Sequence, residues 1–137
     1  MSETIRQETR VSARTPVAGV LWATASAIAI WAVATTAGAE LTVSFGLGQP
    51  IQKITVVNVV LTALVGSLAG SGLFILLRAF TTKARAVWTV TAIVAALVSL
   101  AGPLSAIASA GTKVSLVAMH LIVATVLIVV LRRTTPR

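Results

Sequence analysis

The sequence predicts an all-α membrane protein, a four-transmembrane-helix bundle in up-down-up-down order. Three observations lead to this fold class: 57% of the 137 residues are hydrophobic, only 10% are charged, and the apolar residues form four long uncharged runs. Soluble proteins are typically about 45–50% apolar and about 25% charged. An uncharged run of about 18 or more residues can cross the hydrocarbon core of a bilayer as a helix.

The first predicted span, residues 17–38, follows a polar segment that we expect to be a cytoplasmic tail, residues 1–15. Between them, Pro16 is well suited to the first turn of a helix. The sequence Ala37-Gly38-Ala39 is typical of a signal-peptide cleavage site, and removal of residues 1–39 would leave three spans. Span one is longer than the roughly 7–15 apolar residues of a signal peptide, which argues against cleavage.

Three further spans complete a transmembrane domain over residues 16–133. We expect these spans at residues 54–77, 86–107 and 114–131, followed by a C-terminal tail at residues 134–137. Residues 39–53 form the longest connection and are expected along the outer surface. Within span three, Gly102-Pro103 should kink or end the helix, because proline lacks a backbone donor.

Basic residues predict the orientation, since Lys and Arg near span ends are retained in the cytoplasm. With both termini cytoplasmic, nine basic residues lie inside: Arg6, Arg10, Arg14, Arg78, Lys83, Arg85, Arg132, Arg133 and Arg137. Only Lys53 and Lys113 lie outside. The predicted location is therefore the bacterial inner membrane, with the lipid bilayer as the first partner.

Composition also excludes several classes of function. The chain has no cysteine, which excludes disulfides, a thiol nucleophile and a Cys-ligated metal. One histidine and three acidic residues form no metal-binding pattern, no cofactor motif is present, and no catalytic residue is assigned. The net charge of +8 comes from residues that flank apolar runs, so we expect no nucleic-acid partner.

Small residues recur at helical spacing and predict helix-packing positions. They are Gly66 and Gly70 in span two, and Gly102 beside Pro103 in span three. Small side chains let helices approach closely in lipid, either within one chain or between the subunits of a homo-oligomer or a complex with a membrane partner.

His120 is the only titratable residue deep inside a predicted span. Asn58 lies at a similar depth in span two, roughly 6–9 Å below the outer surface at about 1.5 Å per residue. We expect the two side chains to touch or to share one cavity. Further members of this outer polar cluster are Thr62, Ser99, Ser105 and Glu40.

Two interpretations of the cluster stay open. A histidine hydrogen-bonded to Asn58 or to a backbone carbonyl would be a helix–helix contact worth about 1 kcal/mol. Alternatively, His120 belongs to a proton-sensitive binding or transport site, because ionisable groups inside membranes are rare and histidine titrates near neutral pH.

The chain resembles an uncharacterised, mostly actinobacterial family of small four-span integral membrane proteins. The residues that carry this resemblance are residues 99–104, Met119-His120-Leu121, residues 126–128 and Trp88. It implies a four-helix membrane protein and supplies no activity. The favoured function is accordingly a structural or partner-binding membrane subunit. The alternative is a small-molecule, lipid or proton-coupled transporter or binding protein with a pocket around His120, and an enzyme is the least favoured class.

Overall fold

A computed structural model describes residues 14–133 of the chain. The predicted tail at residues 134–137 and most of the tail at residues 1–15 lie outside the described residues. The first helix already includes Arg14 and Thr15.

The described chain is helical apart from one short hairpin. The helices are α2 (Arg14–Thr36), α3 (Val56–Phe80), α4 (Ala84–Ser99), α5 (Ala101–Ser105) and α6 (Ala110–Arg133). Four stretches are long and apolar enough to cross a membrane: Pro16–Thr36, Val56–Phe80, Ala84–Ser105 and Ala110–Arg133. The all-helical class and the four candidate spans are therefore confirmed.

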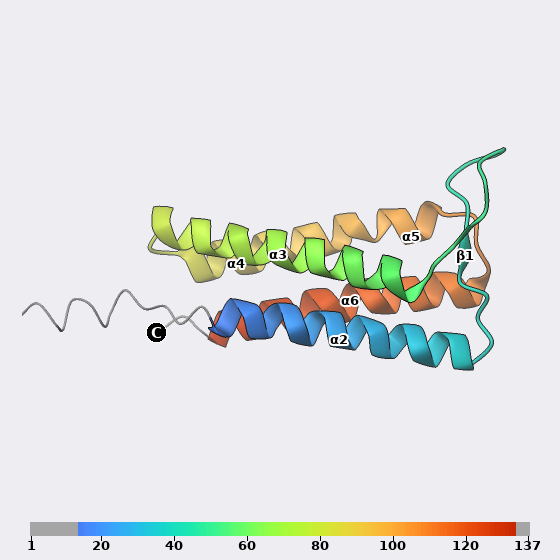
Figure 1. Ribbon diagram of the computed structural model, residues 1–137. Helices are drawn as coiled ribbons and strands as arrows, with labels where there is room; N and C mark the ends of the chain where they lie inside the picture. The colour runs from blue at the N-terminus through green and yellow to red at the C-terminus, as the bar shows by residue number, and fades with distance from the viewer. Residues whose placement is uncertain (1–13, 134–137) are drawn as a thin grey trace, which may run out of the picture.

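The helices lie lengthwise beside one another (Figure 1). The start of α2 and the end of α6 lie at one end of the structure, which we call the terminal end. The hairpin and the α5–α6 connection lie at the opposite end, which we call the hairpin end.

Local capping explains where two helices begin. At the start of α3, the Thr55 side chain accepts a hydrogen bond from the backbone N–H of Asn58. At the start of α6, Ser109 Oγ accepts one from the backbone N–H of Thr112 (3.2 Å). Such N-caps satisfy helix donors that have no partner within the helix. Because Ser109 provides one, α6 begins at Ala110, four residues before the expected start of span four at residue 114.

Pro103 interrupts the third span. Helix α4 ends at Ser99, and the five-residue helix α5 follows from Ala101 with Pro103 buried inside it. Proline has no N–H to donate to the carbonyl four residues earlier, which here belongs to Ser99. The break expected at Gly102-Pro103 is therefore present as a change from α4 to α5.

A hairpin that the sequence analysis did not predict joins α2 to α3. Strands β1 (Thr42–Val43) and β2 (Gln52–Lys53) are antiparallel and pair Thr42 with Lys53. Ser44 also exchanges two backbone hydrogen bonds with Ile107, of 3.0 and 2.8 Å. The first connection is thereby fixed to the end of the third span.

The buried residues form two clusters at different levels of the bundle. Toward the hairpin end, Ala27, Val59, Ala63 and Met119 join α2, α3 and α6. Toward the terminal end, Phe74, Trp88 and Leu131 join α3, α4 and α6. Most other large apolar side chains are exposed, as expected for helices surrounded by lipid.

Candidate functional site

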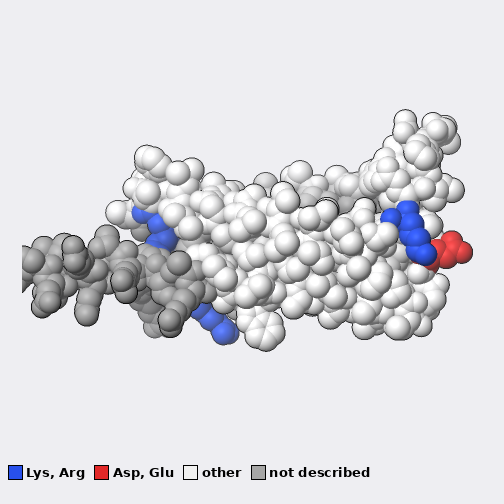
Figure 2. All heavy atoms as spheres, viewed as in Figure 1, with Lys and Arg blue, Asp and Glu red and all other residues white. Residues whose placement is uncertain are grey.

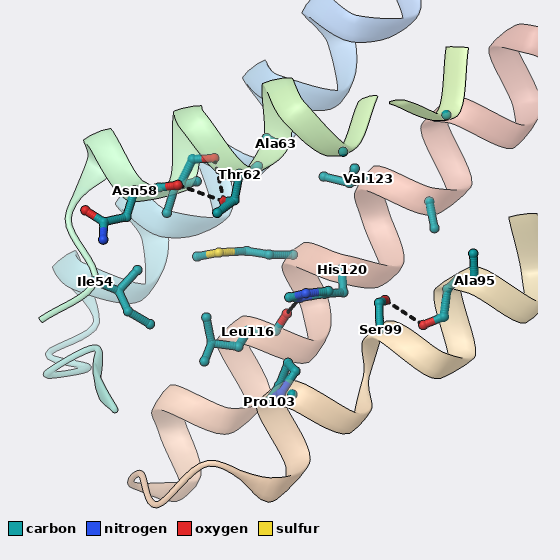
Figure 3. Close-up of a pocket in the computed structure, with 18 of the residues that line it drawn as sticks. Ile54, Asn58, Thr62, Ala63, Ala95, Ser99, Pro103, Leu116, His120 and Val123 are labelled. Carbon is teal, nitrogen blue, oxygen red and sulfur yellow. Dashed lines mark hydrogen bonds between the residues drawn. The ribbon is translucent and has the colours of Figure 1, made fainter. Parts of the chain in front are cut away.

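The principal feature of the hairpin half is a cavity of about 630 Å³. Its residues come from α3 on one side, from α4 and α5 on the other, and from α6 between them (Figure 3). The hairpin contributes Val43, Phe45, Gln52 and Lys53. Pockets that hold small molecules usually measure about 300–1,000 Å³, so this cavity is large enough for a ligand.

Small residues make the cavity wide. The walls from α3 and α4 consist largely of Ala63, Gly66, Gly70, Ala92, Ala95, Ala96 and Ser99. A Cβ atom added to Gly66 or to Gly102 would meet no other atom within 4 Å, whereas one added to Gly70 would lie 3.3 Å from Trp88 Cη2. Of the three glycines predicted as packing positions, only Gly70 therefore closely contacts another helix, and Gly66 and Gly102 face open space.

His120 presents one ring nitrogen that has no protein partner. Its Nδ1 lies 2.8 Å from the Leu116 carbonyl oxygen, one turn earlier in α6. Because a carbonyl can only accept, Nδ1 carries the proton and donates it. In the neutral ring Nε2 is then an acceptor, and no residue of 14–133 donates a hydrogen bond to it.

The hydroxyl groups that line the cavity donate to backbone carbonyls of their own helices. Thr62 Oγ1 donates to the Asn58 carbonyl (2.7 Å), and Ser99 Oγ donates to the Ala96 carbonyl (2.7 Å). Thr55 Oγ1 donates to the side-chain oxygen of Asn58. The Asn58 NH₂ group has no acceptor within the described part of the chain, so it is a second group that could bind a ligand.

Asn58 and His120 line the same cavity but do not bond to each other. No hydrogen bond joins their side chains in residues 14–133, and the Asn58 amide points away from the His120 ring (Figure 3). The histidine bonds instead to a carbonyl of its own helix, so it makes no polar contact with another helix. This geometry does not provide the helix–helix hydrogen bond of the first interpretation.

The other predicted site residues divide into two groups. Thr62, Ser99, Gly66, Gly70, Gly102 and Pro103 line the cavity together with Asn58 and His120. Ser105 and Glu40 do not. Ser105 Oγ donates to the Gly102 carbonyl (3.1 Å), and Glu40 is an exposed residue between α2 and β1.

Several lining residues were not predicted from the sequence. Lys53 and Gln52 reach the cavity because they belong to the hairpin, and among residues 14–133 Lys53 is the only Lys, Arg, Asp or Glu that lines it. Trp88 lines the opposite end. The alternation of apolar and polar residues from Leu41 to Leu47 was a signal for a strand and could have revealed the hairpin.

No group of three or more His, Cys, Asp or Glu side chains that could hold a metal ion occurs in residues 14–133. Apart from Lys53 and the imidazole of His120, the polar side chains that line the cavity within residues 14–133 are amides, hydroxyls and the indole of Trp88. Such a site is suited to hydrogen bonding and to apolar contact.

Four helices of this length and hydropathy mark the chain as a membrane protein. A family model described as a family of unknown function, DUF6069, matches residues 7–137, and the chain belongs to this family. The resemblance to an uncharacterised family is confirmed to that extent. No curated protein and no solved structure gives a significant match.

Proposed function

We propose that this protein is a four-span protein of the bacterial inner membrane that binds an elongated, mainly apolar molecule in the cavity between α3 and α4. The observation that carries the proposal is the cavity itself, together with two polar groups at its wall that have no partner within residues 14–133, His120 Nε2 and the side-chain NH₂ of Asn58. A packing contact would need neither the space nor the free groups.

The shape of the cavity supports an elongated ligand. Its α3 wall extends from Asn58 to Gly70, which is about 18 Å at about 1.5 Å per residue. That length exceeds one leaflet, about half of the roughly 30 Å hydrocarbon core. An acyl chain or a molecule of similar length would lie along the small residues, with a polar group near His120.

The proposed orientation is up-down-up-down with both termini in the cytoplasm. The distribution of basic residues supports this orientation. At the terminal end, helix ends and the α3–α4 connection carry Arg78, Lys83, Arg85, Arg132 and Arg133, whereas only Lys53 and Lys113 of the described chain lie at the hairpin end. A reporter that is active only in the cytoplasm should work after Arg137 and fail when inserted after Gly48.

The ligand proposal is tested by filling the cavity. Gly66→Leu places a side chain in the cavity, and Gly72→Leu is the matched control, because Gly72 lies on α3 outside the cavity and also faces open space. We expect native mass spectrometry of the purified protein to show a bound molecule with the wild type and with Gly72→Leu, and at least tenfold less with Gly66→Leu. Equal occupancy in the two variants, or an empty wild-type protein, would contradict the proposal.

A structural or partner-binding subunit is the second candidate function. The observation in its favour is that only 11% of the Ala84–Ser105 span is buried, against 33% of Pro16–Thr36. A helix from another subunit could then cover α4. In that case Gly66→Leu would change the mass of the assembly in detergent rather than the content of small molecules, which separates the two candidates.

A further inference from the structure

The terminal end is strongly basic. Besides Arg14 at the start of α2, five basic residues lie there within the described chain: Arg78, Lys83, Arg85, Arg132 and Arg133. Glu40 is the only acidic residue in residues 14–133, and it lies at the hairpin end (Figure 2). Within residues 14–133, no carboxylate therefore lies at this end beside Arg78, Lys83 or Arg85.

Helix dipoles distinguish two kinds of basic residue at this end. Arg78 lies in the last turn of α3, and Arg132 and Arg133 lie in the last turn of α6. Cations are stabilised there by the negative end of the helix dipole.

The start of α4 is the opposite case. Lys83 is its N-cap and makes no side-chain capping hydrogen bond, Arg85 lies in its first turn, and that turn contains no acidic residue. These cations add to the positive end of the dipole. The arrangement is unfavourable by itself and becomes favourable when an anion binds.

Two buried donors near this turn have no acceptor, which is an independent observation. Neither Arg85 Nε nor Trp88 Nε1 has a hydrogen-bond partner in the described structure, and both atoms are buried. The whole Trp88 side chain is only 3% exposed. Residues three apart in a helix share a face, so both side chains lie on one face of α4. Buried donors are almost always paired, so an acceptor is missing at this position.

We propose that the first turn of α4 binds the anionic headgroup of a bilayer phospholipid, with Lys83 and Arg85 on its phosphate oxygens. The apolar surroundings favour a lipid as the source of the phosphate. Next to this turn, Phe80 is 81% exposed, and Leu76 and Val87 are also exposed. Acyl chains can cover these side chains while the headgroup stays with the cations. The cations of the site lie at the end of the bundle opposite His120, and only Trp88 is shared with the lining of the cavity.

Trp88 provides a direct measurement, because hydrogen bonding and the approach of a phosphate both shift an indole N–H resonance. The full chain would carry Trp22→Phe, which removes an exposed indole and leaves Trp31 as an internal reference. Trp31 Nε1 donates to the Ile54 carbonyl (3.1 Å) at the hairpin end, so its resonance reports folding. The protein in zwitterionic nanodiscs is titrated with phosphatidylglycerol, with phosphatidylcholine of the same chains, and with inorganic phosphate.

We expect phosphatidylglycerol alone to shift the Trp88 resonance in a saturable manner and to leave Trp31 unchanged. Lys83→Gln with Arg85→Gln should weaken this binding at least tenfold. The matched control, Arg78→Gln with Arg133→Gln, removes the same charge from helix C-termini and should weaken it less than threefold. Equal losses in the two double variants, or no shift at all, would overturn the site, and an equal shift with inorganic phosphate would overturn the lipid as its ligand.

Discussion

The two halves of the bundle use glycine and alanine in opposite ways. At the terminal end, Gly70 lies against Trp88, and Trp88 packs edge-to-face on Phe74 with ring centroids 5.6 Å apart. One turn earlier, Gly66 lines the cavity, to which α4 contributes residues as small as Ala95 and Ser99, and a Cβ added to Gly66 would meet no atom within 4 Å. A small residue allows close packing when a large side chain stands opposite, and it leaves space when another small residue does. The same motif thus joins helices in one half and separates them in the other.

The largest effect should come from removing the bulky partner at the terminal end. Trp88→Ala deletes a side chain that is 3% exposed and should lower the free energy of unfolding by about 3–5 kcal/mol, the range for large aromatic residues in cores. Trp22→Ala is the control, because Trp22 is 66% exposed and should lose less than about 1 kcal/mol. Equilibrium unfolding in mixed micelles measures both, and similar losses would show that the terminal end is not the tighter half.

A smaller effect should follow from adding volume at the two glycines. Gly70→Leu places atoms where even a Cβ would lie 3.3 Å from Trp88, and such overpacking should destabilise the protein by about 1–3 kcal/mol. Gly66→Ala meets no atom within 4 Å and should stabilise it by about 0.5–1 kcal/mol, the helix preference of alanine over glycine. The same unfolding assay applies, and a loss at Gly66 comparable to that at Gly70 would mean that the cavity closes in the membrane.

The smallest effect is expected from coupling between Asn58 and His120. Because no hydrogen bond joins them, a double-mutant cycle with Asn58→Leu and His120→Leu should give a coupling free energy below about 0.5 kcal/mol for unfolding. The aromatic pair at the other end, Phe74 and Trp88, should give about 0.5–1.5 kcal/mol in the same kind of cycle. Coupling between Asn58 and His120 that equals the aromatic value would indicate a direct contact and would favour the packing interpretation.

The sequence predicts much of this fold because membranes impose simple rules. Each candidate span corresponds to an uncharged run, and the break before Pro103 follows from the missing N–H. Hydropathy carries no information on what lies opposite Gly66, since that depends on how α3 and α4 are placed against α6. For this reason the width of the cavity could not be predicted, although a contact or a shared cavity was expected from the similar depth of Asn58 and His120.

Loop residues were the least predictable part of the site. Lys53 lines the cavity through the hairpin, whose position depends on backbone hydrogen bonds between Ser44 and Ile107, far apart in the sequence. Ser105 was expected in the cluster from its depth, but its hydroxyl bonds to the Gly102 carbonyl within the short helix α5. Depth along a helix can be counted from the sequence, whereas the direction of a side chain at a helix break cannot.

The packing of α2 against α6 has a consequence for how the protein is made. A Cβ added to Gly19 of α2 would lie 3.4 Å from Val130 Cγ1 of α6, so the first helix of the described chain packs on the last. Roughly a hundred residues separate them, which is about 5–20 s of translation at 5–20 residues per second. During that interval the face of α2 that bears Ala23 lacks its final neighbour, and lipid or the insertion machinery must cover it until α6 arrives.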